Sequence, residues 1–109
     1  MITIRLSKQA QQELHEIHEY IAIELDNQTA AYDILQKMIE ALDTLIEFPD
    51  IGSPMRSILP LERNYRFLVV GEYLIVYRHE VESETVYVLR ILYGRSDYMK
   101  TLFREPPLS

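Results

Sequence analysis

The chain has 109 residues, the usual length of one domain, and we predict a single domain across residues 1–109. Its net charge of −6 argues against non-specific nucleic-acid binding, and the absence of cysteine excludes disulfides and thiolate metal sites. No apolar run approaches the roughly 18 residues of a membrane span, and no signal peptide is evident. We therefore expect a cytoplasmic protein that does not bind membranes.

Hydrophobic periodicity predicts a strand followed by two helices. Residues 2–6 alternate apolar and polar side chains, as a strand with one buried face does. Ser7 is a good N-cap for an amphipathic helix over residues 8–25. Asn27 or Thr29 can cap a second helix, which stops before Pro49. The short break between the helices predicts an antiparallel helical hairpin.

The second half of the chain predicts an antiparallel meander. Proline and glycine exclude a helix or a central strand in the connector 49–64. Residues 65–70, 73–79 and 85–93 are rich in Val, Ile, Leu and Tyr, which favour strands. Gly71 comes first in a two-residue connection, which is typical of a type II′ hairpin turn.

The predicted fold class is therefore α+β, with the helical hairpin packed on a mainly antiparallel sheet. The first strand is expected to join this sheet. One arrangement places it beside the last strand, and the sequence leaves its register open. Ser96 or Asp97 can cap a short C-terminal helix through Phe103, and Pro106 and Pro107 end the ordered chain.

The meander strands are apolar on both faces. Alternation places Tyr73, Ile75 and Tyr77 on one face of their strand, with Leu74 and Val76 on the other. In the last strand, simple alternation opposes two sets, namely Val86, Val88 and Leu92 against Tyr87, Leu89, Ile91 and Tyr93. Two helices cover one face of such a sheet. Either the C-terminal helix covers the other face, or an apolar patch remains there for a partner.

Arginines and tyrosines are interleaved along the same strands. The residues are Arg66, Arg78, Arg90 and Arg95, with Tyr65, Tyr77, Tyr93 and Tyr98. In one interpretation they are amphipathic edge residues whose stems cover apolar surface. In the other they form a groove for phosphate or carboxylate groups, with aromatic faces for bases. Period-two spacing does not decide between the two.

The histidines give weaker signals. His15 and His18 lie three residues apart, without the four-residue spacing of zincin-type ligands, so we expect no metal site. His79 ends a strand in an acidic turn, where it is either solvated or a general base. No serine or threonine has the neighbours of an activated nucleophile.

Taken in order, these segments resemble the RelE/ParE superfamily of toxins from type II toxin–antitoxin modules, closer to the ParE branch. The matching segments span nearly the whole chain: 6–10 (LSKQA), 48–54 (FPDIGSP), 70–78 (VGEYLIVYR) and 89–98 (LRILYGRSDY). The resemblance implies a cognate antitoxin as partner, no cofactor, and a homodimer as one state of the free toxin. ParE-type members poison DNA gyrase, whereas RelE-type members are metal-independent endoribonucleases that cut mRNA on the ribosome.

The resemblance also suggests site residues. For a RelE-like nuclease the nearest catalytic candidates are Arg66, Arg78, Arg95 and Tyr98. The expected antitoxin- or target-binding residues are Tyr73, Ile75, Tyr77, Arg90, Tyr93, Arg95, Met99 and Phe103. Many ParE-like sequences have histidine where this chain has Tyr93, and the lysine-rich RNA-gripping patch of RelE-type toxins is missing. Three functions stay open: a gyrase inhibitor, a ribosome-dependent nuclease, and a non-toxic remnant that only binds antitoxin.

Overall fold

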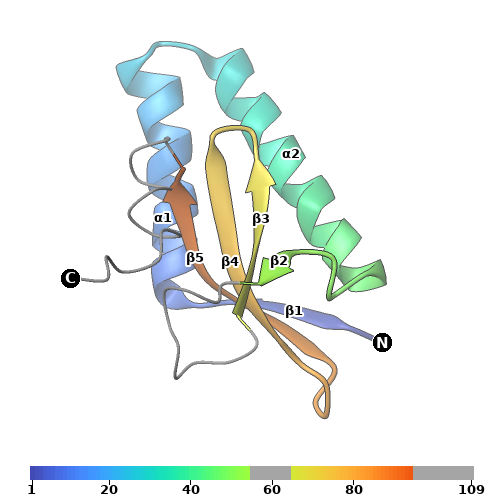
Figure 1. Cartoon of the computed structure of the whole chain (residues 1–109). Helices are drawn as coiled ribbons and strands as arrows, with labels where there is room; N and C mark the ends of the chain where they lie inside the picture. The colour runs from blue at the N-terminus through green and yellow to red at the C-terminus, as the bar shows by residue number, and fades with distance from the viewer. Residues whose placement is uncertain (55–64, 95–109) are drawn as a thin grey trace, which may run out of the picture.

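The computed structural model describes residues 1–54 and 65–94. A pair of helices packs on one side of a sheet (Figure 1). The elements in chain order are β1 (Thr3–Leu6), α1 (Lys8–Glu19), the π-helix η1 (Tyr20–Glu24), α2 (Gln28–Glu47), β2 (Ser53–Pro54), β3 (Tyr65–Val70), β4 (Tyr73–Glu80) and β5 (Thr85–Tyr93). The α+β class is confirmed. The predicted C-terminal helix lies outside the described residues.

The sheet is mixed, with strand order β1-β5-β4-β3-β2. β1 pairs with β5 in parallel, and the remaining neighbours are antiparallel, so the meander and the place of the first strand are both confirmed. The turn between β3 and β4 also agrees with the prediction. Gly71 has a φ of +60°, while Glu72 is not among the residues with positive φ, as a type II′ turn requires.

Both predicted helix caps are present. The Ser7 hydroxyl accepts a hydrogen bond from the Ala10 N–H at 2.9 Å, and the Asn27 side chain does the same for Ala30. Each cap typically stabilises the fold by about 1 kcal/mol. The expected continuous helix over residues 8–25 is not α-helical throughout, because it passes into η1 at Tyr20. A π-helical turn holds an extra residue and often marks a functional segment.

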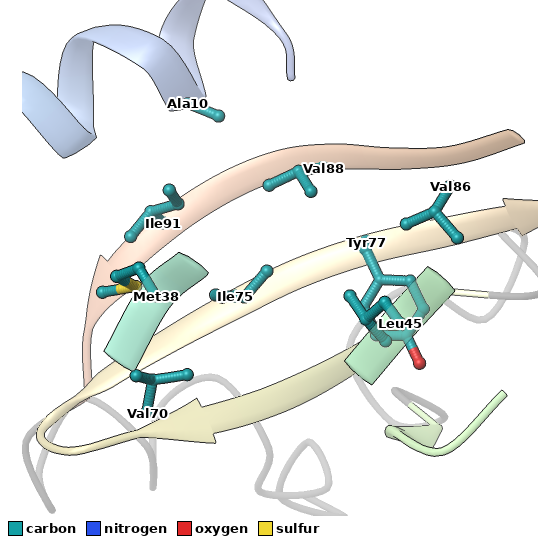
Figure 2. Packing of buried hydrophobic residues seen from close by; sticks show 9 residues of the cluster. All are labelled: Ala10, Met38, Leu45, Val70, Ile75, Tyr77, Val86, Val88 and Ile91. Carbon is teal, nitrogen blue, oxygen red and sulfur yellow. The ribbon is translucent and has the colours of Figure 1, made fainter. Parts of the chain in front are cut away.

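The core lies between the two helices and one face of the sheet (Figure 2). Ala10 and Met38 from the helices, with Ile75 and Val88 from the strands, are all at least 98 % buried. Apolar area removed from water contributes roughly 25 cal/mol per Å², so the burial of this layer stabilises the fold.

A β-bulge changes which residues of β5 face the helices. Tyr77 pairs with Val88, but Val76 pairs with Arg90, so Leu89 is an extra residue on β5. Ile91 and Tyr93 therefore lie on the same face as Val86 and Val88, and Ile91 belongs to the core. Simple alternation, which placed Ile91 and Tyr93 on the opposite face, was wrong for this reason.

Side chains of the first helix close the edge of β5 beyond the end of β1. The Ser7 hydroxyl donates a hydrogen bond to the Leu89 carbonyl at 2.7 Å, and the Glu13 carboxylate accepts one from the Ile91 N–H at 2.8 Å. The other Glu13 oxygen accepts from the Arg90 guanidinium at 2.6 and 2.9 Å. Backbone groups that a sixth strand would otherwise pair are thus satisfied.

Candidate functional site

The three predicted arginines that the structure describes, Arg66, Arg78 and Arg90, do not form one cluster. Arg66 lies at the helix-covered side of the sheet, where its guanidinium donates to the Gly52 carbonyl at 2.7 Å and lies 3.7 Å from the Asp50 carboxylate. Arg90 is held by Glu13 at the edge of β5. Arg95 lies outside the described residues. Arg66 and Arg90 therefore position the connector after α2 and the first helix.

Arg78 belongs to an arginine–tyrosine row on the opposite face of the sheet. We use this name for Arg5, Tyr87, Arg78 and Tyr65, which come from β1, β5, β4 and β3 and are neighbours in register. The Arg78 guanidinium carbon lies 5.6 Å from the centre of the Tyr87 ring and 5.9 Å from that of Tyr65. The Arg5 guanidinium carbon lies 5.8 Å from the centre of the same Tyr87 ring. Cations and rings thus alternate across four strands.

One donor in this row has no hydrogen-bond partner among residues 1–54 and 65–94. The Arg78 side chain is about one-third exposed and lies 3.6 Å from the Glu80 carboxylate, but its Nε atom is buried without a hydrogen bond. On the same face Leu74 and Val76 are buried, whereas Val69 near the edge is 56 % exposed. The face thus combines cations, aromatic rings and an apolar edge.

The histidines have separate surroundings. His79 Nδ1 lies 2.9 Å from the Asp50 carboxylate, on the face of the sheet opposite the arginine–tyrosine row. His15 pairs with Glu19 at 3.3 Å along the first helix. Across residues 1–54 and 65–94, no group of three or more His, Cys, Asp or Glu side chains is arranged to hold a metal ion. None of the helices in these ranges is long and apolar enough to cross a membrane.

Two of the expected partner-binding residues lie in the core. Ile75 and Tyr77 are fully buried under the helices, so they stabilise the fold and present no surface to a partner. The Tyr77 hydroxyl accepts a hydrogen bond from the Gly52 N–H at 2.9 Å, and burial raises its pKa above 10. Tyr98, Met99 and Phe103 lie outside the described residues.

Tyr73 and Tyr93 instead line a groove of about 900 Å³ between the helical hairpin and the end of the sheet. Figure 1 shows the β3–β4 turn and the end of β5 directed toward the connected end of the hairpin. We call this the hairpin groove, and its lining is Glu16, Ile17, Tyr20, Ile21, Leu25, Ala30, Asp33, Ile34, Lys37, Gly71, Glu72, Tyr73 and Tyr93. The π-helical segment therefore forms part of its wall.

The lining of the hairpin groove is acidic and aromatic. The rings of Tyr73 and Tyr93 contact each other, with centroids 5.4 Å apart and planes tilted by 54°. Burial raises the pKa of Tyr73 above 10, and the neighbouring Tyr93, Glu72 and Tyr20 raise it further because each disfavours a phenolate there. A cationic group entering the groove would meet favourable charge and ring faces.

Sequence reasoning missed several of these residues. Arg5 and Tyr87 were not linked to Arg78, because their adjacency depends on the parallel register of β1 with β5. Leu25 was assigned to the apolar stripe of the first helix, yet it is 55 % exposed, and Tyr20, which is 54 % exposed, was not singled out. No feature of the sequence indicated Tyr20, because the helix expected over residues 8–25 ran through it without a break.

The sequence of this chain matches a known protein family. A family model described as the ParE toxin of the type II toxin–antitoxin system, parDE, matches residues 4–98. No curated protein matches the chain.

Solved structures share the fold. A chain of the chromosomal ParDE toxin–antitoxin system from P. aeruginosa is similar with a TM-score of 0.70 and 18 % identity, covering 87 % of this chain and 98 % of that one. A chain of the RelBE2 toxin–antitoxin complex from Mycobacterium tuberculosis has a TM-score of 0.59 and 22 % identity, covering 84 % of this chain and 96 % of that one. A chain of the intact E. coli RelBE toxin–antitoxin complex has a TM-score of 0.54 and 15 % identity, covering 87 % of this chain and 99 % of that one.

Proposed function

Because this chain belongs to the ParE toxin family of type II toxin–antitoxin systems, we propose that it arrests growth by binding DNA gyrase and is neutralised by a cognate antitoxin. The observation that carries the proposal is the ParE family match, which extends over residues 4–98. The higher TM-score with the ParDE chain than with the two RelBE chains agrees with it. Binding alone suffices for this mode of action.

The described geometry favours binding over strand cleavage. General acid–base catalysis needs a proton-transfer group within hydrogen-bond reach of the reacting atom. His79 lies on the face of the sheet opposite Arg78 and is engaged with Asp50. Arg66, another nuclease candidate, is engaged with Gly52 and Asp50. Among the described residues, the predicted nuclease residues do not converge.

The arginine–tyrosine row is the proposed contact with the target. Arginine and tyrosine are over-represented among residues that dominate binding energy, because they combine large contact area with directed hydrogen bonds. The row lies outside the helix-covered core, so a partner can contact it without disturbing that core. The unpaired Arg78 Nε is a donor that a small rearrangement on binding would satisfy.

The test is to induce the toxin alone in cells and to follow DNA synthesis and protein synthesis by pulse labelling. Gyrase inhibition predicts that DNA synthesis stops first. Arg78→Ala should abolish the arrest, and Arg78→Lys should give partial loss because it keeps the charge but not the stacked guanidinium. Lys8→Ala, an exposed cation on α1, is the matched control and should remain toxic. Arrest by Arg78→Ala equal to wild type would contradict the proposed contact.

The arginine–tyrosine row also favours a second candidate, a ribosome-dependent endoribonuclease. Cations between aromatic rings are typical of surfaces that bind single-stranded nucleic acid. This candidate predicts that purified toxin cuts mRNA in translating ribosomes, and that Arg78→Ala, Arg95→Ala or Tyr98→Phe slows the cut. Protein synthesis would then stop before DNA synthesis. Intact mRNA after incubation would eliminate it, and strong expression without any arrest would leave the non-toxic remnant.

A further inference from the structure

One flank of α2 exposes apolar side chains at regular spacing. Tyr32, Ile39 and Ile46 follow one another at intervals of seven residues and are 60 %, 52 % and 39 % exposed. Half-buried Leu35 and Leu42 lie between them, so the intervals along the helix alternate between three and four residues. We call these five residues the α2 stripe. Such spacing is typical of a helix that packs lengthwise against a second helix.

The α2 stripe is separate from the other surfaces of the molecule. The residues that α2 contributes to the hairpin groove are Ala30, Asp33, Ile34 and Lys37, and none of them belongs to the stripe. The arginine–tyrosine row lies on the face of the sheet away from the helices. We propose that the α2 stripe packs against the same stripe of a second copy of this chain, in an antiparallel dimer. The inference concerns the free toxin and does not depend on gyrase being the target.

The α2 stripe is complementary to itself about Ile39. In a dimer with twofold symmetry every contact occurs twice, so the surface must match its own rotated copy. Tyr32 and Ile46 are equally far from Ile39 along the helix. A twofold axis at Ile39 therefore brings Tyr32 of each copy against Ile46 of the other, and Ile39 against its own counterpart. The large ring at one end of the stripe thus meets the smaller side chain at the other end.

The charges along α2 favour the antiparallel arrangement. Across the whole of α2, Gln28–Glu47, no acidic residue lies in the first turn and no basic residue in the last, while Asp43 and Glu47 lie near the C-terminal end. The helix dipole favours acids at the start of a helix and disfavours them at its end. An antiparallel second copy places Asp43 and Glu47 beside the start of its own α2. A parallel second copy would instead bring like charges together.

The side chain at one end of the α2 stripe is already ordered. Gln36 Nε2 donates a hydrogen bond to the Tyr32 hydroxyl at 2.6 Å, which holds the phenol along the helix surface. Fixing an exposed side chain before association lowers the entropy that binding costs. Gln36 also borders the stripe one heptad before Asp43. The antiparallel arrangement brings Gln36 near Asp43 of the second copy, and the amide has a second N–H to donate to that carboxylate.

The length of the α2 stripe sets the expected affinity. α2 has 20 residues, which corresponds to a length of about 30 Å, and the stripe occupies about two-thirds of it. A single pair of helices of this length forms an interface at the low end of the specific range, on the order of 1,000 Å² in total. We therefore expect a dimer Kd on the order of 1–100 μM.

The test is the mass of the purified, full-length free toxin, measured by sedimentation equilibrium from about 1 μM to about 1 mM. Wild type should change from one chain to two across this range. Ile39→Glu should raise the dimer Kd at least about a hundredfold, because two carboxylates would meet at the twofold axis. The matched control is Val81→Glu, the same change in charge at a 71 % exposed apolar residue in the β4–β5 turn, which should dimerise as wild type does. Thermal melts establish that each variant is folded.

A mixing experiment tests the direction of the two helices. Tyr32→Glu and Ile46→Lys should each weaken the dimer when measured alone, because each places a charge against an apolar residue. Their equimolar mixture should dimerise more tightly than either variant. Antiparallel packing brings position 32 of one copy against position 46 of the other, so that opposite charges meet only in the mixed dimer.

Four results would overturn the inference. Wild-type toxin could stay monomeric at about 1 mM. Ile39→Glu could dimerise as tightly as Val81→Glu. The mixture could be no tighter than its components. Ile39→Glu could also keep the wild-type mass but lose antitoxin binding or gyrase inhibition, which would assign the α2 stripe to that partner. If the dimer forms as described but gyrase is not inhibited, the proposed function fails while this assignment stands.

Discussion

The carboxylate of Glu13 should be a main determinant of stability. It joins α1 to the edge of β5 by accepting from the Ile91 N–H and from two nitrogens of Arg90. Its side chain is 16 % exposed, whereas that of Arg90 is 41 % exposed. The ion pair is therefore partly screened by water and contributes about 1 kcal/mol. The charge-assisted bond to the Ile91 N–H contributes about 1.5–2 kcal/mol.

Glu13→Ala should thus lower the free energy of unfolding by about 2–3 kcal/mol and Tm by roughly 10 °C for a domain of this size. Glu13→Gln keeps an acceptor for the Ile91 N–H and should lose about half as much. Glu16→Ala, one turn further along the same helix and exposed, is the control and should change stability by less than about 0.5 kcal/mol. Urea denaturation of the purified free toxin measures all three.

A Glu13→Ala variant as stable as Glu16→Ala would contradict this role of Glu13. A double-mutant cycle with Arg90→Ala separates the two contributions. We expect a coupling of about 1 kcal/mol between Glu13 and Arg90, with the rest of the Glu13 effect persisting in the Arg90→Ala background. A coupling equal to the full effect would mean that the bond to the Ile91 N–H contributes nothing.

Three further predictions concern the junction between the connector and β4. Gly52→Ala should cost about 1–3 kcal/mol in urea denaturation, because the new methyl would lie 2.6 Å from the Tyr77 hydroxyl and 2.7 Å from the Phe67 carbonyl. Tyr77→Phe should cost about 1–3 kcal/mol in the same assay, since it leaves the buried Gly52 N–H without its acceptor, and an unchanged midpoint would contradict that role. The pKa values of Tyr73 and Tyr77 are raised in the folded protein, so the stability that these neutral phenols contribute is complete below pH 10. It is lost as the pH rises through the folded-state pKa values. The Tm of Tyr77→Phe should therefore fall less steeply with alkaline pH than the Tm of wild type.

Local sequence signals predicted the elements because their causes are local. Ser7 and Asn27 supply side-chain oxygens at the helix starts, and Gly71 supplies the positive φ of the β3–β4 turn. The strands β3 and β5 begin and end where the composition indicated. These features need no knowledge of distant partners.

The misses depend on pairing between distant segments. Leu89 forms the bulge only through the register of β5 against β4, and this one residue moves Ile91 to the opposite face from the one that alternation predicts. The contact of Arg5 with Tyr87 needs the parallel pairing of β1 with β5. The site expectations for Ile75 and Tyr77 treated apolar strand residues as a binding surface, although the helix layer covers them.

The hairpin groove was equally inaccessible to sequence reasoning. Its wall includes Tyr20, whose exposure follows the change from α- to π-helix, and the sequence pattern gave no sign of that change. Tyr73 and Tyr93 were named as binding residues from strand patterning and family resemblance. Their contact with each other and with the hairpin groove depends on the bulge and on the end of the sheet.

The most direct test of the central claim is a supercoiling assay with purified gyrase and purified toxin. Excess wild-type toxin should stop supercoiling, Arg78→Ala should not, and prior addition of the antitoxin should restore activity. Supercoiling that continues unchanged in excess wild-type toxin, with gyrase from more than one species, would contradict gyrase as the target.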